Sequence, residues 1–149
     1  MIDCPNNRLA KGLTMMKKVI VVLVVSLFVV AGGLYAFMFH DTNNLVSHTK
    51  DLLRGEIDPE QTAGTPEDRY NTADQYANQL SGRVANVNVT VDRLFVFHNS
   101  RDGFMIVRYS FEALDSESRV LCGSWRIISH WKIHKVNDEW QIVGIRENP

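Results

Sequence analysis

The stretch NVNVTVDRLFVFHNSRDGFMIVRYSF, residues 86–111, decides the fold, because polar and apolar residues alternate through most of it. Its odd positions carry the apolar side chains Val87, Val89, Val91, Phe95 and Phe97, and then Met105, Val107, Tyr109 and Phe111. Residues 99–103 (NSRDG) interrupt the alternation with residue types that favour a tight turn. The stretch therefore predicts two antiparallel strands joined by a hairpin, with one apolar face.

Two more polar turns follow, residues 115–118 (DSES) and 137–139 (NDE). Three hairpin connections in series predict a four-stranded antiparallel meander. Residues 119–136 are too many for one flat strand, so that strand should bend or bulge. Counting outward from the turns places Phe97 opposite Met105, Arg93 opposite Tyr109 and Tyr109 opposite Trp125, which would make one face apolar across three strands.

Two helices are predicted before the sheet. Residues 41–55 repeat leucines at helical spacing and end at a glycine. Residues 66–81 follow Thr65 as a helix cap, begin with a proline and carry an apolar stripe. The expected fold class is therefore α+β, with one or two helices packed on a curved four-stranded antiparallel meander sheet.

An apolar run precedes these helices. Residues 19–39 (VIVVLVVSLFVVAGGLYAFMF) contain no charge, and about 20 helical residues cross a bilayer core of ~30 Å. The formal charge is +3 before the run and -4 after it, which favours a cytoplasmic N-terminus. We expect a single-pass plasma (inner) membrane protein. Its parts are a tail over 1–18, a transmembrane helix over 19–39, a helix and linker over 40–64, and an extracytoplasmic α+β domain over 65–149 on which helix 41–55 packs.

A cleaved signal peptide is the alternative interpretation of the run. The residues before it are basic, and the small residues 31–33 (AGG) suit a signal peptidase. The apolar stretch continues to residue 39, beyond the usual length of a signal-peptide core, which favours an uncleaved anchor. Both interpretations export the same domain. Residues 1–14 are either a short cytoplasmic tail or an over-extended start before Met15.

Composition excludes several classes of protein. A chain of 149 residues with a net charge of -1 has room for one exported domain and no overall field that would attract nucleic acid. Cys4 and Cys122 lie on opposite sides of the apolar run, so no disulfide between them is expected. No phosphate loop, nucleophile elbow or paired-cysteine motif is present, and we expect no cofactor and no catalytic residue.

The first candidate site is a row formed by Arg93, Tyr109 and Trp125 on the apolar face. A guanidinium stacked on aromatic rings could present its charge to an anionic ligand in a concave sheet. The alternative is a change of register near Arg93, since Leu94 and Val96 make the even positions apolar beyond that point.

The second candidate is the opposite face of the sheet, as a protein-interaction surface. Apolar residues there are more numerous than a solvated face requires. The counted register also places Arg108 directly opposite Arg126, where an acidic group such as Asp92 or an acidic partner would relieve the repulsion. The expected surface comprises Leu94, Val96, Ile106, Arg108, Arg126 and Ile128.

Metal binding is not expected. His130 and His134 have the spacing of a helical metal pair, but on a strand four residues span ~13 Å, too far to share one ion.

The hairpin WKIHKVNDEWQIV at residues 131–143, closing a sheet that helices precede, resembles the superfamily of nuclear transport factor two, SnoaL and ketosteroid isomerase. The resemblance covers roughly residues 42–147 and implies a cystatin-like α+β fold. Behind one membrane span, the arrangement is similar to the bitopic assembly subunit of type IV secretion and conjugation systems, whose exported domain has this fold.

These observations lead to one functional hypothesis and two alternatives. The hypothesis is a non-enzymatic, membrane-anchored module that binds other bacterial envelope or secretion proteins, as a monomer or a homo-oligomer, and no nucleic acid. The first alternative is a SnoaL-type cone that binds or converts a small ligand with Tyr109, Arg93 and either Asp92 or His130. The second is a secreted domain released by signal-peptide cleavage.

Overall fold

The structure of the chain is a computed structural model that describes the backbone of residues 6–71 and 83–147, and side chains from residue 16 onward. The chain divides into two compact units, Met1–Phe37 and Met38–Pro149. Each unit is described by itself below.

The first unit holds most of one long helix, α1 (Asn6–Asp41), whose last four residues belong to the second unit. Every described side chain from residue 16 to residue 37 is exposed, although residues 19–37 carry no charge. The helix is long and apolar enough to cross a membrane. It begins well before the apolar run, so the segment expected as a tail is helical from Asn6.

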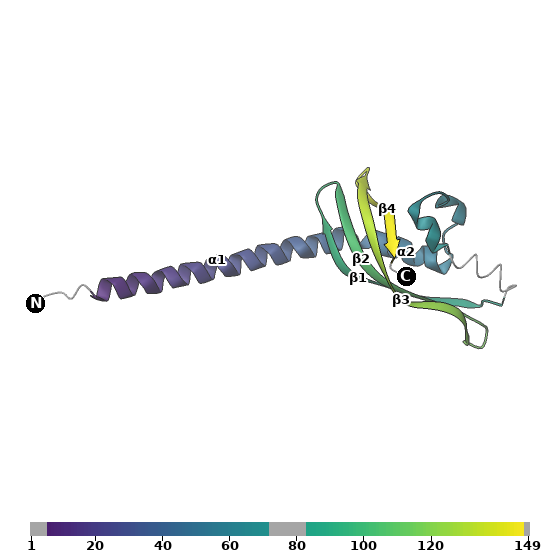
Figure 1. Ribbon diagram of the computed structural model, residues 1–149, viewed down its shortest axis with the longest axis horizontal. Coiled ribbons are helices and arrows are strands. Elements are labelled where there is room, and N and C mark those ends of the chain that lie inside the picture. The colour runs from purple at the N-terminus through teal and green to yellow at the C-terminus, as the bar shows by residue number, and fades with distance from the viewer. Residues whose placement is uncertain (1–5, 72–82, 148–149) are drawn as a thin grey trace, which may run out of the picture. The chain divides into compact units, whose positions relative to one another are not determined.

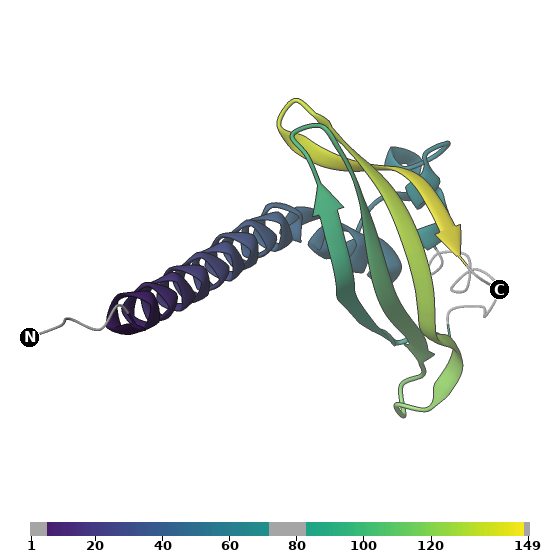
Figure 2. The same cartoon turned by 60° about the vertical axis from the view of Figure 1, so that its left-hand side comes forward.

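The second unit has the expected α+β architecture, with short helices first and a four-stranded sheet last (Figure 1). The helical elements are α2 (Asn43–Arg54) and two short 3-10 helices, η1 (Pro59–Gln61) and η2 (Pro66–Tyr70). The strands are β1 (Asn86–His98), β2 (Asp102–Leu114), β3 (Val120–Val136) and β4 (Glu139–Glu147). They pair antiparallel in the order β1-β2-β3-β4, which confirms the meander. Figure 2 shows that the long strands curve.

Helix α2 covers one face of the sheet, and its sequence explains why. Leu45, Thr49, Leu52 and Leu53 are buried on one side of the helix. The helix ends at Gly55, whose φ of 73° lets its N–H bond back to the last turn. The inner face of the sheet is the face that α2 covers.

The second predicted helix differs from the structure. Thr65 and Pro66 begin a helical segment as expected, but η2 is a 3-10 helix that ends at Tyr70. The rest of the expected helix, up to residue 81, lies largely outside the described residues.

Two hairpin turns follow their sequences closely. Asn99 Oδ1 accepts hydrogen bonds from the N–H groups of Arg101 and Asp102, which closes the β1–β2 turn. In the β3–β4 turn, Asn137 and Asp138 both have positive φ, 51° and 65°. Positive φ at both central residues is the geometry of a two-residue hairpin turn whose twist matches that of the flanking strands.

The register between β1 and β2 is one residue off the counted one next to the turn, and a bulge in β1 at Leu94 shifts it by one residue more. Before the bulge Arg93 lies opposite Val107, not Tyr109; after it Phe97 lies opposite Phe104, not Met105. One extra residue transfers all later side chains to the other face. Phe95 and Phe97 therefore lie on the outer face, whereas Val96 is fully buried on the inner one. The expected alternative of a register change near Arg93 is confirmed.

The register between β2 and β3 differs too. Tyr109 lies opposite Ile127, and Trp125 lies beyond a second irregularity between Tyr109 and Phe111. Arg126 adopts a positive φ of 56° at this point. The extra residues carry Trp125 out of the row that the sequence predicted.

The core of the unit lies between the inner face of the sheet and the helical elements. Its largest buried side chains come from α2, η2 and all four strands: Leu52, Leu53, Tyr70, Val96, Met105, Val107, Trp131, Ile133 and Trp140.

Candidate interaction surface

The three residues predicted to bind an anionic ligand do not form one row. Arg93 binds the start of the domain instead, because its Nη1 donates to Thr42 Oγ1 and its Nη2 to Asn43 Oδ1, each at 2.6 Å. The guanidinium also lies 3.6 Å from the centre of the Phe39 ring. Arg93 thus fastens the end of α1 and the start of α2 to the sheet.

Tyr109 belongs to a buried polar network on the inner face. Its hydroxyl donates to Glu147 Oε1 at 3.1 Å. Next to it, the Tyr70 hydroxyl accepts from Trp131 Nε1 at 2.7 Å and lies 3.0 Å from Ser129 Oγ. Burial raises the pKa of both tyrosines well above the ordinary value, and for Tyr109 the Glu147 carboxylate raises it further. Both phenols therefore stay protonated and act as hydrogen-bond partners in the core.

The residues assigned to a SnoaL-type cone are also dispersed. Tyr109 is on the inner face and Arg93 lies at the end of α1. Asp92 is exposed and bound to Arg108 Nη2 at 2.8 Å, and His130 is exposed on the outer face. The described residues thus do not bring this set together around one substrate position.

Trp125 is 55% exposed, and its indole N–H donates to Glu112 Oε1 at 2.6 Å. The glutamate holds the ring in a defined position without covering it. Trp125 is therefore available at the surface, although not beside Arg93 or Tyr109.

The expected interaction face is only partly on one surface. Leu94 and Arg126 are exposed, and Ile106 and Ile128 are partly buried. Arg108 lies opposite Ile128 rather than Arg126, and Asp92 directly opposite it supplies the acidic partner. Val96 was expected here but is in the core, because the bulge at Leu94 turns it inward.

Sequence reasoning missed an aromatic cluster that the same bulge creates on the outer face. The rings of Phe95 and Phe104 stack with their centres 5.4 Å apart, and Phe97 lies 6.1 Å from Phe104. Phe97 and Phe104 are 54% and 46% exposed. The signal was present as apolar residues on both odd and even positions from 94 to 97, which a single unbroken strand cannot bury.

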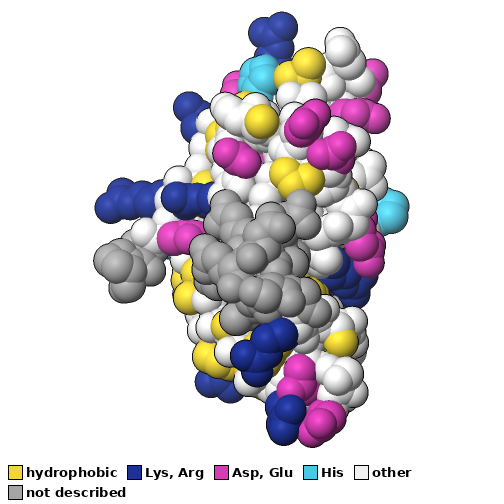
Figure 3. Space-filling model, turned by 90° about the vertical axis from the view of Figure 1, so that its right-hand side faces the viewer, with side chains coloured by type: hydrophobic (Ala, Val, Ile, Leu, Met, Phe, Trp, Pro, Cys, Tyr) yellow, Lys and Arg dark blue, Asp and Glu magenta, His cyan; other side chains and the backbone are white. Residues whose placement is uncertain are grey.

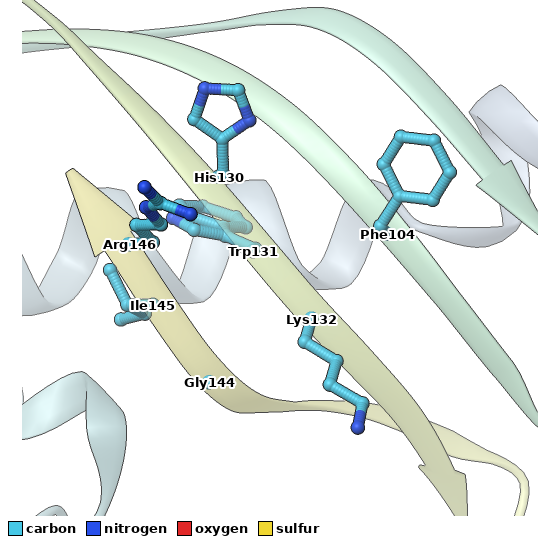
Figure 4. A pocket seen from close by; sticks show the side chains of 7 residues that line it. All are labelled: Phe104, His130, Trp131, Lys132, Gly144, Ile145 and Arg146. Atoms are coloured by element: carbon cyan, nitrogen blue, oxygen red, sulfur yellow. The ribbon is translucent and has the colours of Figure 1, made fainter. Parts of the chain in front are cut away.

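A shallow hollow of about 370 Å³ adjoins this cluster on the outer face (Figure 4). Phe104, His130, Lys132 and Arg146 stand around it, and the strands β3 and β4 form its floor. Its remaining lining residues are Trp131, Gly144 and Ile145.

A second hollow, of about 480 Å³, lies among α2, η2 and the β3–β4 hairpin. It is acidic, with Asp41, Glu67, Asp138 and Glu139 in its lining. Burial raises the pKa of Glu67, and the nearby His48, 3.4 Å away, opposes that rise. Figure 3 shows acidic side chains gathered in the upper part of one face of the molecule.

No group of three or more histidines, cysteines and carboxylates within residues 16–71 and 83–147 is placed to hold a metal ion. His134 instead lies 2.7 Å from Asp102 across the β2–β3 pair. His130 and His134 pair with different residues of β2.

No protein-family model matches the sequence, and no curated protein is significantly similar to it. Among solved structures, a nuclear transport factor 2 (NTF2-like) superfamily protein from Salmonella enterica serovar Typhimurium is similar, with 12% identity and a TM-score of 0.45. The match covers 79% of this chain and 92% of that one. A variant of a chain called Rd1NTF2_05 is similar over 72% of this chain and 96% of its own, with 11% identity and a TM-score of 0.39. The function is therefore inferred from the chain's own residues.

Proposed function

We propose that this chain is a membrane-anchored, extracytoplasmic module that binds other proteins of a bacterial envelope, as a component of a secretion or conjugation assembly. It would act by docking and not by catalysis. The observation that carries the proposal is the outer face of the sheet. On strand β3 of this small domain, which an apolar helix precedes, two large apolar side chains, Val120 and Trp125, are at least half exposed.

The anchor in this proposal is the part of α1 over residues 19–39. Its side chains up to residue 37 are exposed and apolar, which is the arrangement that lipid stabilises and water does not. The excess of basic residues before it favours export of the residues that follow.

The part of the outer face best suited to a protein partner surrounds Trp125. Tryptophan supplies large contact area at exposed sites and dominates many interfaces, with arginine next in frequency. Trp125 and Arg126 are adjacent, exposed and held on strand β3, with Val120 exposed on the same strand. A partner that covered this group would bury apolar surface and an aromatic anchor together.

The test is site-specific photocrosslinking in the native membrane with the full chain. A photoreactive amino acid at position 125 or 128 should give one defined adduct with an envelope protein or with a second copy of the chain. The same group at Glu60, which is exposed in η1 on the other side of the domain, is the control and should give none.

A second variant separates binding from folding. Trp125→Ser should abolish the adduct at position 128 while the thermal unfolding midpoint stays near that of the wild type. Uniform or absent crosslinking from positions 125, 128 and 60 would contradict the proposal.

A further inference from the structure

The outer face near the β1–β2 hairpin has a composition that differs from the region around Trp125. We define the hairpin patch as the aromatic residues Phe95, Phe97 and Phe104 together with the basic residues Arg101, Lys132 and Arg146. Phe97, Phe104, Lys132 and Gly144 follow one another across the four strands. Phe95, Ile106, His130 and Arg146 form the neighbouring row. The patch is therefore one continuous surface.

The depth of this patch relative to a membrane follows from Asp41. The apolar run ends at Phe39, and a helix rises ~1.5 Å per residue, so Asp41 lies ~3 Å beyond the end of the run. The polar headgroup layer on each side of the hydrocarbon core is thicker than that. If the run spans the bilayer, Asp41 lies among the lipid headgroups.

Asp41 in turn fixes the hairpin ends of the sheet at that depth. Its Oδ2 accepts a hydrogen bond from Trp140 Nε1 at 2.7 Å, and lies 3.5 Å from Lys135 Nζ and 3.8 Å from His98 Nε2. His98 is next to Phe97 in β1, and Lys135 N–H donates to the carbonyl of Arg101 in the first hairpin turn. The hairpin patch thus adjoins residues that touch Asp41.

The charges of the patch are unbalanced. Among the described residues, Lys132, Arg146 and Arg101 have no acidic side chain within ion-pair distance. The acidic residues that share this face are engaged, Asp102 with His134 and Asp92 with Arg108. Asp138 and Glu139, at the neighbouring hairpin, line the acidic hollow beside α2. The basic residues of the patch and the acidic residues of the hollow therefore lie in different parts of the domain.

We propose that the hairpin patch lies on the anionic headgroup surface of the membrane that holds α1. The inference rests on the proposed anchoring. Exposed phenylalanines beside unpaired lysine and arginine are the combination that binds a lipid interface, since the rings enter the headgroup boundary and the cations bind phosphate. A protein partner is less suited to this patch, because lysine is depleted from the buried centres of protein interfaces. Docking on the membrane would leave the region around Trp125 for proteins.

The test measures membrane depth at two matched turn positions of the full chain in lipid nanodiscs. Ser100 and Ser116 are exposed turn serines, at the β1–β2 and β2–β3 connections. Each is changed to cysteine and labelled with a fluorophore, with Cys4 and Cys122 replaced by alanine. The probe is a lipid that carries a nitroxide on its headgroup, in discs of phosphatidylcholine with or without phosphatidylglycerol.

The expected result is several-fold stronger quenching at S100C than at S116C in discs with phosphatidylglycerol, and a smaller difference in neutral discs. The double variant Lys132→Glu with Arg146→Glu should remove the dependence on anionic lipid. Arg126→Glu, an exposed arginine elsewhere on β3, is the matched control and should leave it unchanged.

If the chain enters the discs, the inference would be overturned by equal quenching at both positions or by quenching that does not depend on the charge of the lipid. A chain that does not enter the discs would overturn the anchoring proposal and this inference with it. The inference would also be overturned if S100C showed no quenching and if changing Phe97 and Phe104 to serine abolished a protein crosslink. That result would assign the patch to a protein partner.

Discussion

Asp41, the last residue of α1, contacts three side chains of the sheet: Trp140, Lys135 and His98. The hydrogen bond from Trp140 lowers the pKa of its carboxyl, and the charges of Lys135 and His98 lower it further, against an opposing effect of burial. A carboxyl whose pKa is lowered on folding stabilises the folded state above its ordinary pKa. That stabilisation is lost as the pH falls through the pKa of the folded state.

Asp41→Asn should therefore destabilise the domain by about 1 kcal/mol at pH 7, because the hydrogen bond from Trp140 loses its charged acceptor. The difference from the wild type should close as the pH falls below about 4. Thermal unfolding in detergent micelles, followed at several pH values, measures both. A difference that persists unchanged at low pH would show that the charge of Asp41 is not responsible.

Tyr70 is the centre of the buried network with Ser129 and Trp131. Tyr70→Phe should cost about 1–2 kcal/mol of stability at neutral pH, because it removes hydrogen bonds from buried groups. Since folding raises the pKa of this phenol, the wild type should lose stability as the pH rises above about 10. The variant should lose it less steeply. Chemical denaturation across that pH range is the measurement.

The sequence singles out Arg93 and Trp125 as residues of interest, but it does not predict the contacts that they make in the fold. Arg93 was recognised as an unusual charge on an apolar face, and the structure explains it by Thr42, Asn43 and Phe39. Those partners are about fifty residues away in the chain, so no local pattern contains them. Trp125 is predicted opposite Tyr109 on the apolar face because its phase is counted from a turn, and the irregularities of β3 change that count.

At the scale of elements, the sequence predicts the hairpins by position, and it predicts the bulges only as an open alternative near Arg93 and as a bend somewhere in residues 119–136. The turns at 99–103 and 137–139 consist largely of residue types that favour tight turns over strands, so the positions of these turns follow from the sequence. The bulge at Leu94 is indicated only by apolar residues at both odd and even positions of β1. Such a pattern is compatible with more than one strand register. It decides which residues form the outer face, and so the hairpin patch was not predictable.

The first hairpin should depend on Gly103. A Cβ at that position would overlap with His98 Cβ and would lie 2.6 Å from the carbonyl oxygen of Phe97. Gly103→Ala should therefore destabilise the domain by about 1–3 kcal/mol, because backbone must move to accommodate it.

Gly144→Ala is the matched control on β4, where the nearest atom would be at an ordinary 3.6 Å. It should leave stability within about 0.5 kcal/mol of the wild type. Unfolding of both variants under the same conditions tests the pair. Equal losses of stability in the two variants would contradict the prediction that the close backbone approach at Gly103 requires a glycine.

For the whole molecule, the α+β class and the meander order followed from period-two patterning and turn spacing. A helix able to span a membrane followed from the length of the uncharged run. The partner surface around Trp125 and the hairpin patch did not follow, because the sequence leaves open the register of the strands that form them. The proposed function depends on the helix holding the domain at a membrane.

Labelling of Ser116→Cys in intact spheroplasts, in the Cys122→Ala background, tests that claim most directly. A membrane-impermeant maleimide should label the variant before lysis. The labelled species should remain in the membrane pellet after alkaline carbonate and should retain residues 19–39 by mass spectrometry. Labelling of a shortened, soluble species that lacks this segment, or no labelling until the cells are lysed, would contradict the account.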